Sequence, residues 1–178
     1  MNKLEGVSGY LSDTNRETLE KYIKKLLEKK NSLEVVDVGS LLGLSSITMA
    51  SVGKVKVYSI EPNPACKEEF ERNVEKTGTD CTLYEMTSEE FGKKHIPEQI
   101  DACFIDGIHT PPGVKLDIDL IASRVRKGGY IMFHDVNLYD IKGLIESYEG
   151  KMFNFVEEEV TEYLKGKPYG NIYVGERI

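Results

Sequence analysis

The stretch VVDVGSLLGLSS, residues 35–46, decides the fold class of this chain. A β-branched run leads into Gly39 and Gly43, and the apolar residues beyond them have helical spacing as far as Gly53. Glycines in such a turn let the backbone bend tightly and approach a ligand closely, and the start of the helix offers free N–H groups. The pattern predicts a strand, a turn and a helix, although turns that bind nothing also contain glycines.

Strands and helices alternate on both sides of this stretch. Upstream, apolar residues at helical spacing predict an N-terminal helix over about residues 14–30, with Thr14 and Glu17 as its capping box. Downstream, the pattern predicts a strand at 56–61, a helix from Asn63 to Gly78, a strand at 81–85, a short helix after Ser88, a strand at 100–106, a helix from Val114 to Arg126 that stops at Gly128 and Gly129, and a strand at 130–135. The runs at 151–160 and 170–178 read as two strands without a clear helix between them.

Such alternation, with strands that are apolar on both faces, is typical of a parallel sheet covered by helices on both sides. The two C-terminal runs are expected to pair as an antiparallel hairpin at the end of that sheet. We therefore predict an α/β fold, a three-layer Rossmann-like sandwich with a mostly parallel, seven-stranded sheet. No linker or repeat divides the sequence, so residues 1–178 are expected to form one domain.

The composition indicates a soluble globular protein, because 40% of the residues are hydrophobic and 30% are charged. A net charge of −7 argues against a nucleic-acid partner and against an anionic membrane surface. No signal peptide is recognisable, and no apolar run approaches the roughly 18 residues that a membrane span needs. We expect a cytoplasmic protein that acts on a small molecule, either as a monomer or as a homo-oligomer.

In this architecture, ligands bind at the carboxyl ends of the parallel strands. Polar residues stand at those ends: Asp37, Gly39, Glu61, Thr87, Ser88, Asp106, His109, His134 and Asp135. Glu61 follows the glycine turn by about 20 residues, where an acid commonly accepts hydrogen bonds from ribose hydroxyls. Leu41 occupies the place of the second glycine of dinucleotide motifs, which disfavours a pyrophosphate. The pattern predicts an adenosine-containing cofactor without phosphates.

Four segments in this order resemble the class I S-adenosylmethionine-dependent methyltransferases: VVDVGSLLGLSS, YSIEPNP, FIDGIHTPPGVKLDI and VRKGGYIMFHDV. The resemblance runs from about Val7 to Asn137. It is closest to the small-molecule O-methyltransferases that have a D-G-x-H strand end and a later H-D or E-D pair. That group includes metal-dependent sugar and antibiotic O-methyltransferases.

The resemblance implies that S-adenosylmethionine is the cofactor. Its binding residues would be Asp37, Gly39, Ser40, Glu61, Thr87, Ser88 and Asp106. In this interpretation Asp37 and Gly39 lie by the methionine part, Glu61 binds the ribose, and Thr87 and Ser88 lie by the adenine. Tyr10 and Ser12 either close over the cofactor or only begin the N-terminal helix.

Methyl transfer to oxygen needs a hydroxyl that is losing its proton, and a divalent ion with a neighbouring histidine can bring this about. By resemblance, Asp106, His134 and Asp135 would bind Mg²⁺ or Mn²⁺, and His109 would be the general base. His134 departs from those members of the group that have Glu at this position.

The sequence therefore predicts methyl transfer from S-adenosylmethionine to a hydroxyl of a small molecule, assisted by a divalent metal. Two alternatives stay open at this point. One is a binding module that keeps the cofactor pocket without catalysis. The other, disfavoured by Leu41, is an NAD-dependent oxidoreductase.

Overall fold

The structure is a computed structural model, and it describes residues 4–137, 141–159, 162–164 and 167–178. Its elements in chain order are α1 (Asp13–Leu27), β1 (Leu33–Val38), α2 (Leu44–Ala50), β2 (Val55–Ile60), a 3-10 turn η1 (Pro64–Cys66), α3 (Lys67–Thr77), β3 (Cys81–Tyr84), α4 (Ser88–Lys94), β4 (Ile100–Ile105), α5 (Pro111–Leu120), a second 3-10 turn η2 (Ala122–Arg124), β5 (Val125–His134), α6 (Lys142–Glu146), β6 (Phe153–Glu159), β7 (Glu162–Leu164), β8 (Lys167–Tyr169) and β9 (Ile172–Arg177).

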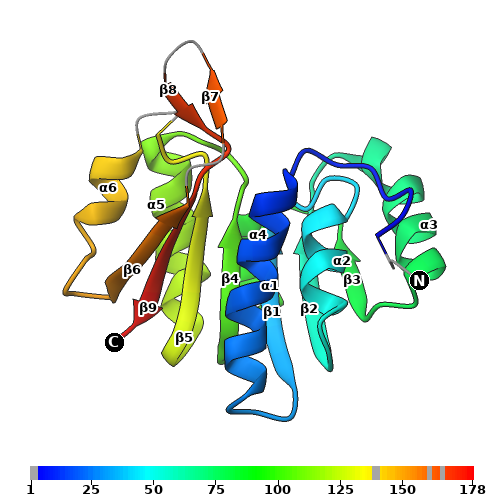
Figure 1. Ribbon diagram of the computed structural model, residues 1–178, viewed down its shortest axis with the longest axis horizontal. Helices are drawn as coiled ribbons and strands as arrows, with labels where there is room; N and C mark the ends of the chain where they lie inside the picture. The colour runs from blue at the N-terminus through cyan, green and yellow to red at the C-terminus, as the bar shows by residue number, and fades with distance from the viewer. Residues whose placement is uncertain (1–3, 138–140, 160–161, 165–166) are drawn as a thin grey trace.

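Seven strands form one sheet in the order β3-β2-β1-β4-β5-β9-β6 (Figure 1). The pairs from β3 to β5 are all parallel, and β9 pairs antiparallel with both β5 and β6. The predicted fold class, a mostly parallel sheet with an antiparallel C-terminal hairpin, is confirmed. The sequence did not predict β7 and β8, which follow β6 in the chain and pair with each other. In Figure 1 they project above the main sheet, at the end where β5 finishes.

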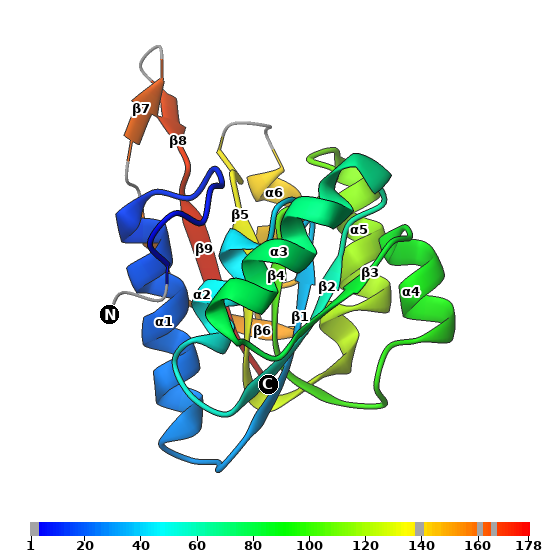
Figure 2. The same cartoon turned by 90° about the vertical axis from the view of Figure 1, so that its right-hand side faces the viewer.

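Helices cover both faces of the sheet, which makes the three layers seen in Figure 2. Apolar side chains of α1 and α2, such as Leu19, Ile23 and Met49, pack on one face. Those of α4, α5 and α6, such as Phe91 and Ile118, pack on the other. The strands are apolar on both faces because each face is buried, which is why they lack simple alternation in the sequence.

The N-terminal helix starts one residue earlier than the prediction, at Asp13, and ends at Leu27. Its capping box joins Ser12 and Asn15, so the predicted box of Thr14 and Glu17 is wrong. The Ser12 hydroxyl accepts the Asn15 N–H at 3.1 Å, and the Asn15 side chain accepts the Ser12 N–H in return. A short asparagine here replaces the usual Glu or Gln of the motif.

The predicted helix from Val114 to Arg126 is also wrong at both ends, because α5 runs from Pro111 to Leu120. Thr110 caps its start and the prolines occupy the first turn, where a missing N–H costs nothing. Gly128 and Gly129 lie within β5 and do not end a helix. At Gly129 a β-carbon would come within 2.3 Å of the Asp101 carbonyl oxygen, where the β4–β5 register shifts.

None of the helices in the described parts of the chain combines the length and the hydropathy that a membrane crossing requires. The short helix α6, which the sequence pattern did not reveal, packs Ile145 against the sheet.

Candidate active site

The turn after β1 holds the backbone of Gly39 against the end of β4. Gly39 has φ of 84°, and a β-carbon there would lie 2.2 Å from the Asp106 carbonyl oxygen. Gly43, with φ of 92°, precedes α2 and faces the ring of Phe70. Leu41 also has positive φ, at 46°, which is rare for a residue with a side chain. The turn therefore needs glycine at position 39 for space as well as for conformation.

Glu61 follows β2 and supports this turn with its carboxylate. Its Oε2 accepts the Leu41 N–H at 3.1 Å, and its Oε1 accepts the Asn63 N–H at 2.9 Å. The residue is only 8% exposed. Each carboxylate oxygen has two lone pairs, so both oxygens keep acceptor capacity for a ligand hydroxyl.

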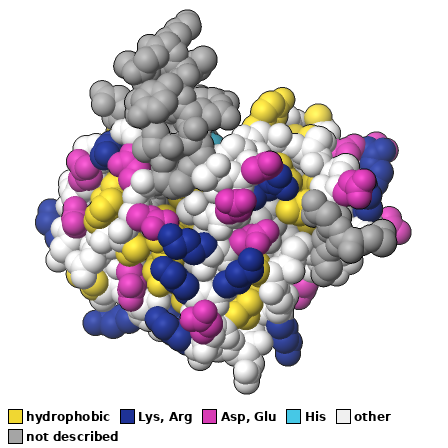
Figure 3. All heavy atoms as spheres, viewed as in Figure 1, with side chains coloured by type: hydrophobic (Ala, Val, Ile, Leu, Met, Phe, Trp, Pro, Cys, Tyr) yellow, Lys and Arg dark blue, Asp and Glu magenta, His cyan; other side chains and the backbone are white. Residues whose placement is uncertain are grey.

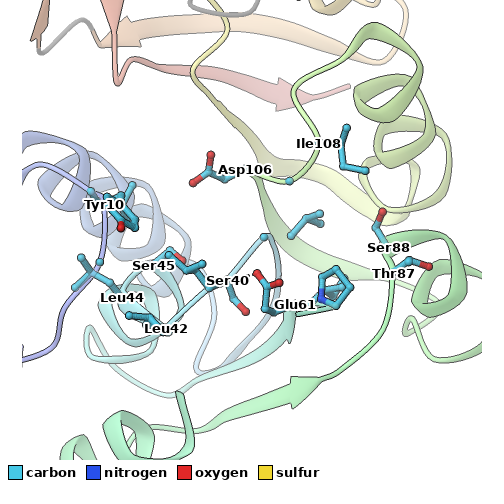
Figure 4. Close-up of a pocket in the computed structure, with 18 residues that line it drawn as sticks. Tyr10, Ser40, Leu42, Leu44, Ser45, Glu61, Thr87, Ser88, Asp106 and Ile108 are labelled. Atoms are coloured by element: carbon cyan, nitrogen blue, oxygen red, sulfur yellow. Dashed lines mark hydrogen bonds between the residues drawn. The ribbon is translucent and has the colours of Figure 1, made fainter. Parts of the chain in front are cut away.

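A cavity of about 370 Å³ opens over the turn, a size that suits a small-molecule ligand. Its walls come from the segment before α1, the glycine turn, the ends of β2 and β4, and the start of α4 (Figure 4). The hydroxyl Oγ of Ser40 is buried in this wall and has no hydrogen-bond partner among the described residues. A buried hydroxyl without a partner is costly, so a ligand that bonded Ser40 would relieve that cost.

Six of the seven residues predicted to bind the cofactor line this cavity: Gly39, Ser40, Glu61, Thr87, Ser88 and Asp106. In Figure 4, Glu61 lies near the centre and Thr87 and Ser88 lie at one end. Asp106 lies across from Glu61, between Tyr10 and Ile108. Asp37 is absent from the lining that the described residues form, and it is fully buried.

Asp37 holds the start of α2 against β1. Its Oδ2 accepts hydrogen bonds from the hydroxyls of Ser45, at 2.6 Å, and Ser46, at 2.5 Å. Burial raises the pKa of Asp37 to about 7, although these two hydrogen bonds act in the opposite direction. Two further carboxylates, Asp106 and Glu61, add to the upward shift in pKa.

At the end of the cavity formed by the start of α4, the side chain of Thr87 caps its own helix. Its hydroxyl accepts the Glu90 N–H at 3.2 Å and donates to the Glu90 carboxylate at 3.0 Å.

Next to Ser88 lies Asp117, a buried carboxyl that the sequence analysis did not single out. Burial raises the pKa of Asp117 to about 6, against the effect of the Ser88 hydroxyl. The signal was available, because Asp117 stands between Val114 and Ile118 on the apolar face of α5.

The segment before α1 supplies the remaining wall. Tyr10 lines the cavity and is 87% exposed, so its ring stands at the mouth. Ser12 caps α1 and is not part of the lining that the described residues form, which matches the alternative of a residue that only begins the helix.

Four ligand-type side chains meet at the ends of β4 and β5: Asp106, His109, His134 and Asp135, whose candidate atoms all lie within 4.8 Å of one another. We call them the His/Asp cluster. The two strands pair in parallel, with Ile105 opposite Phe133, so the residues that follow them emerge side by side. Asp106 belongs to both the cluster and the cavity wall.

Asp106 is the centre of the cluster. Its Oδ1 lies 3.0 Å from Nδ1 of His134 and 3.1 Å from Nε2 of His109. Burial alone would raise the pKa of Asp106, but the two imidazoles outweigh it and hold the pKa below its usual value. Asp135 has φ of 55° and accepts the Gly170 N–H on Oδ1 at 2.8 Å, which leaves Oδ2 3.6 Å from Nδ1 of His134.

Comparison with known proteins identifies the family. A family model described as a methyltransferase domain matches residues 36–136, more than half of the chain. The chain belongs to this methyltransferase family. The resemblance to class I methyltransferases that the motifs carried is thereby confirmed, and the NAD-dependent oxidoreductase alternative is set aside.

A curated relative is the uncharacterised protein R132 of Acanthamoeba polyphaga mimivirus, which is 29% identical over 122 residues. The match covers 62% of this chain, and it spans only 55% of that relative.

Solved methyltransferases share the whole fold. The O-methyltransferase TomG of Streptomyces achromogenes, in complex with SAM, has 14% identity and a TM-score of 0.74, with 94% of this chain and 81% of that chain covered. An rRNA methylase of Streptococcus thermophilus has 15% identity and a TM-score of 0.72, with 96% and 99% covered. At these identities the likeness shows the fold alone, and enzymes with different acceptors share that fold.

Proposed function

We propose that this methyltransferase domain binds S-adenosylmethionine in the cavity and transfers its methyl group to a hydroxyl of a small molecule, with a divalent ion at the His/Asp cluster. The observation that carries the proposal is the double position of Asp106. It lines the cavity proposed for the cofactor and also belongs to the His/Asp cluster. A methyl donor and an activated hydroxyl would therefore meet at one carboxylate.

The cavity wall fits the proposed cofactor. Glu61 offers acceptor lone pairs to ribose hydroxyls, and the orphan hydroxyl of Ser40 suits the polar methionine end. Ser88 lies at the end assigned to the adenine. Asp37 sits beneath the wall, so we assign it to orienting α2 through Ser45 and Ser46, and not to direct contact.

The donor set of the cluster fits a divalent ion, because two carboxylates and two imidazoles lie close enough to share one. Such an ion, when bound, acts as a Lewis acid that acidifies a hydroxyl ligand. We assign Asp106, His134 and Asp135 to holding it and His109 to receiving the hydroxyl proton. In the reaction the C–O bond forms as the C–S bond breaks, the electron pair of that bond stays on sulfur, and the neutral thioether leaves.

The mouth of the cavity favours an acceptor with an apolar part. Tyr10 and Ile108 are 87% and 70% exposed, and they stand on either side of Asp106 in Figure 4. A small hydroxylated compound could lay an aromatic or aliphatic group against them while its hydroxyl reached the cluster. A homo-oligomer could complete this open mouth, and we retain that as part of the proposal.

We propose further that neither nucleic acid nor a membrane is the partner. The net charge is −7, and on the face in Figure 3 basic side chains are interspersed with acidic ones. Nucleic-acid binding usually rests on a basic stripe. The shared fold of the rRNA methylase makes this a point to test, by a gel shift with RNA at moderate salt.

The decisive experiment has two stages. Calorimetry with S-adenosylmethionine tests the cofactor, and a methyl-transfer screen over catechols, sugars and other hydroxylated metabolites tests the reaction. We expect cofactor binding and at least one acceptor whose methylation stops in excess chelator and returns with Mg²⁺ or Mn²⁺. Cofactor binding without transfer to any acceptor would favour the non-catalytic binding module, and full activity in chelator would remove the ion.

A further inference from the structure

Asn15 connects the start of α1 to the His/Asp cluster. It is 1% exposed, and main-chain groups hold both ends of its side-chain amide. Its Oδ1 accepts the Ser12 N–H at 3.3 Å, and its Nδ2 donates to the Gly170 carbonyl oxygen at 2.5 Å. Main-chain N–H and C=O groups have fixed polarity, so these two contacts determine which end of the amide is oxygen. If the amide were flipped, its NH₂ group would face the Ser12 N–H and its oxygen would face the Gly170 carbonyl oxygen, so neither hydrogen bond could form.

This orientation determines where His134 carries its proton. The Nε2 atom of His134 lies 3.3 Å from Oδ1 of Asn15. Because a carbonyl oxygen can only accept, Nε2 must be the donor. The contact is buried, since His134 is only 5% exposed, so water does not readily replace either partner.

With the proton on Nε2, the other nitrogen is left facing two acids. Nδ1 lies 3.0 Å from Oδ1 of Asp106 and 3.6 Å from Oδ2 of Asp135. A lone pair directed at carboxylates is repelled unless a cation, either a second proton on Nδ1 or a metal ion, lies between them. Nδ1 of His134 and Oδ1 of Asp106 lie close enough together that one ion could bind both.

We infer that Asn15 is a positioning residue for the proposed cation site. It holds His134 with its proton on Nε2, so that Nδ1 is presented as a ligand. This imidazole ligand gives the site a preference for a transition ion such as Mn²⁺ over Mg²⁺. The inference rests on the cation site of the proposed function. Imidazole is a poor ligand for Mg²⁺, whereas carboxylates bind both ions, so the discrimination depends on His134. Partners that orient a ligating histidine typically affect metal affinity about 10–100-fold.

Three variants test this role. Asn15→Leu removes both polar atoms. Asn15→Asp keeps an acceptor for Ser12 and His134 but loses the N–H donor to the Gly170 carbonyl, so it separates the acceptor from the donor. Thr18→Val changes another buried polar residue of the same helix, which makes none of these hydrogen bonds, and serves as the control. Circular dichroism establishes that each variant is folded.

The first readout needs no metal. Nitrogen-15 NMR of labelled histidines, at about pH 8 where an ordinary imidazole is neutral, reports which nitrogen of His134 bears a proton. We expect a protonated Nε2 in the wild type, in Asn15→Asp and in Thr18→Val, and its loss as the fixed site in Asn15→Leu. A wild-type His134 protonated on Nδ1, alone or together with Nε2, would overturn the inference.

The second readout is Mn²⁺ binding measured by electron paramagnetic resonance, with Mg²⁺ as competitor. We expect Mn²⁺ affinity to fall about 10–100-fold in Asn15→Leu and the affinity for Mg²⁺ to fall less, while the other two variants keep the wild-type ratio. An unchanged ratio in Asn15→Leu, beside a wild type that does bind Mn²⁺, would overturn this inference alone. A wild type that binds neither ion would overturn the proposed cation site and the preference with it.

Discussion

The backbone of Gly39 touches the backbone of Asp106, so that a β-carbon on the glycine would lie 2.2 Å from the aspartate carbonyl oxygen. The contact joins the turn after β1 to the end of β4, and Gly39 donates its N–H to the Ile60 carbonyl of β2 at 2.9 Å. Three strand ends are thus fixed to one another at the wall of the cavity.

Gly39→Ala is expected to weaken both folding and cofactor binding, because the methyl group would force β1 and β4 apart. Gly78→Ala is the matched control: Gly78 also has positive φ, at 62°, but nothing lies within 4 Å of its added β-carbon. The control should lose only about 1–2 kcal/mol of unfolding free energy, from the backbone conformation, and keep cofactor affinity. Urea unfolding and calorimetry measure the two effects. Equal losses in both variants would mean that the contact with Asp106 is unimportant.

Glu61→Gln is expected to weaken S-adenosylmethionine binding by about 10–100-fold, since a charged hydrogen bond to a hydroxyl contributes roughly 1.5–3 kcal/mol. Gln keeps one acceptor oxygen for the turn, so the fold should survive. Glu34→Gln serves as the control, because Glu34 pairs with Tyr58, at 2.7 Å, away from the cavity. Calorimetry is the measurement, and affinity within twofold of the wild type would remove Glu61 from the site.

Asp37→Asn is expected to stabilise the protein increasingly as pH rises. Burial raises the pKa of Asp37 to about 7, so the folded state keeps this proton after the unfolded state has lost it near pH 4. The stability that the protonated carboxyl contributes is fully present below pH 4 and is lost as pH rises through 7. The variant should therefore gain on the order of 2–4 kcal/mol over the wild type between pH 5 and pH 8.

Urea unfolding of both proteins at the two pH values is the check. Asp119→Asn, on the exposed side of α5 where Asp119 pairs with Lys115, measures the general effect of removing one paired surface charge. A gain for Asp37→Asn that stays constant with pH would contradict the raised pKa.

His109→Gln is expected to lower turnover by about 10²–10⁴-fold while leaving cofactor affinity nearly intact, since a positioned base contributes about that much to the rate. His95→Gln is the control, because His95 is exposed at the end of α4 and outside the cavity. Initial rates with an acceptor from the screen are the measurement. Wild-type turnover by His109→Gln would exclude the base role.

The sequence was sufficient for the strand ends because their positions follow from the parallel topology. Glu61, Asp106 and Asp135 each end a predicted strand, and parallel strands bring their carboxyl ends to one edge. The sequence did not reveal helix boundaries that depend on which of two nearby residues caps the helix. The capping box formed at Ser12 and Asn15 because one helical turn can begin at either of two serine- or threonine-type residues.

The contribution of Asn15 could not have been predicted, because its amide meets Gly170 across 155 positions in the chain. Such a contact depends on how α1 packs on the sheet, and a single asparagine in a first helical turn carries no sign of it. Gly129 is similar, since only the backbone of the adjacent strand shows why it tolerates no side chain.

The shared position of Asp106 has a thermodynamic consequence for turnover. Under the proposed function, a sulfonium and a divalent ion approach the same carboxylate, so each is expected to reduce the affinity for the other, and by the same factor in both directions. Methyl transfer removes the positive charge on sulfur and with it this antagonism. The ion should then be held more tightly in the product complex than before the reaction, and release of the spent cofactor would be the moment at which the two sites become independent again.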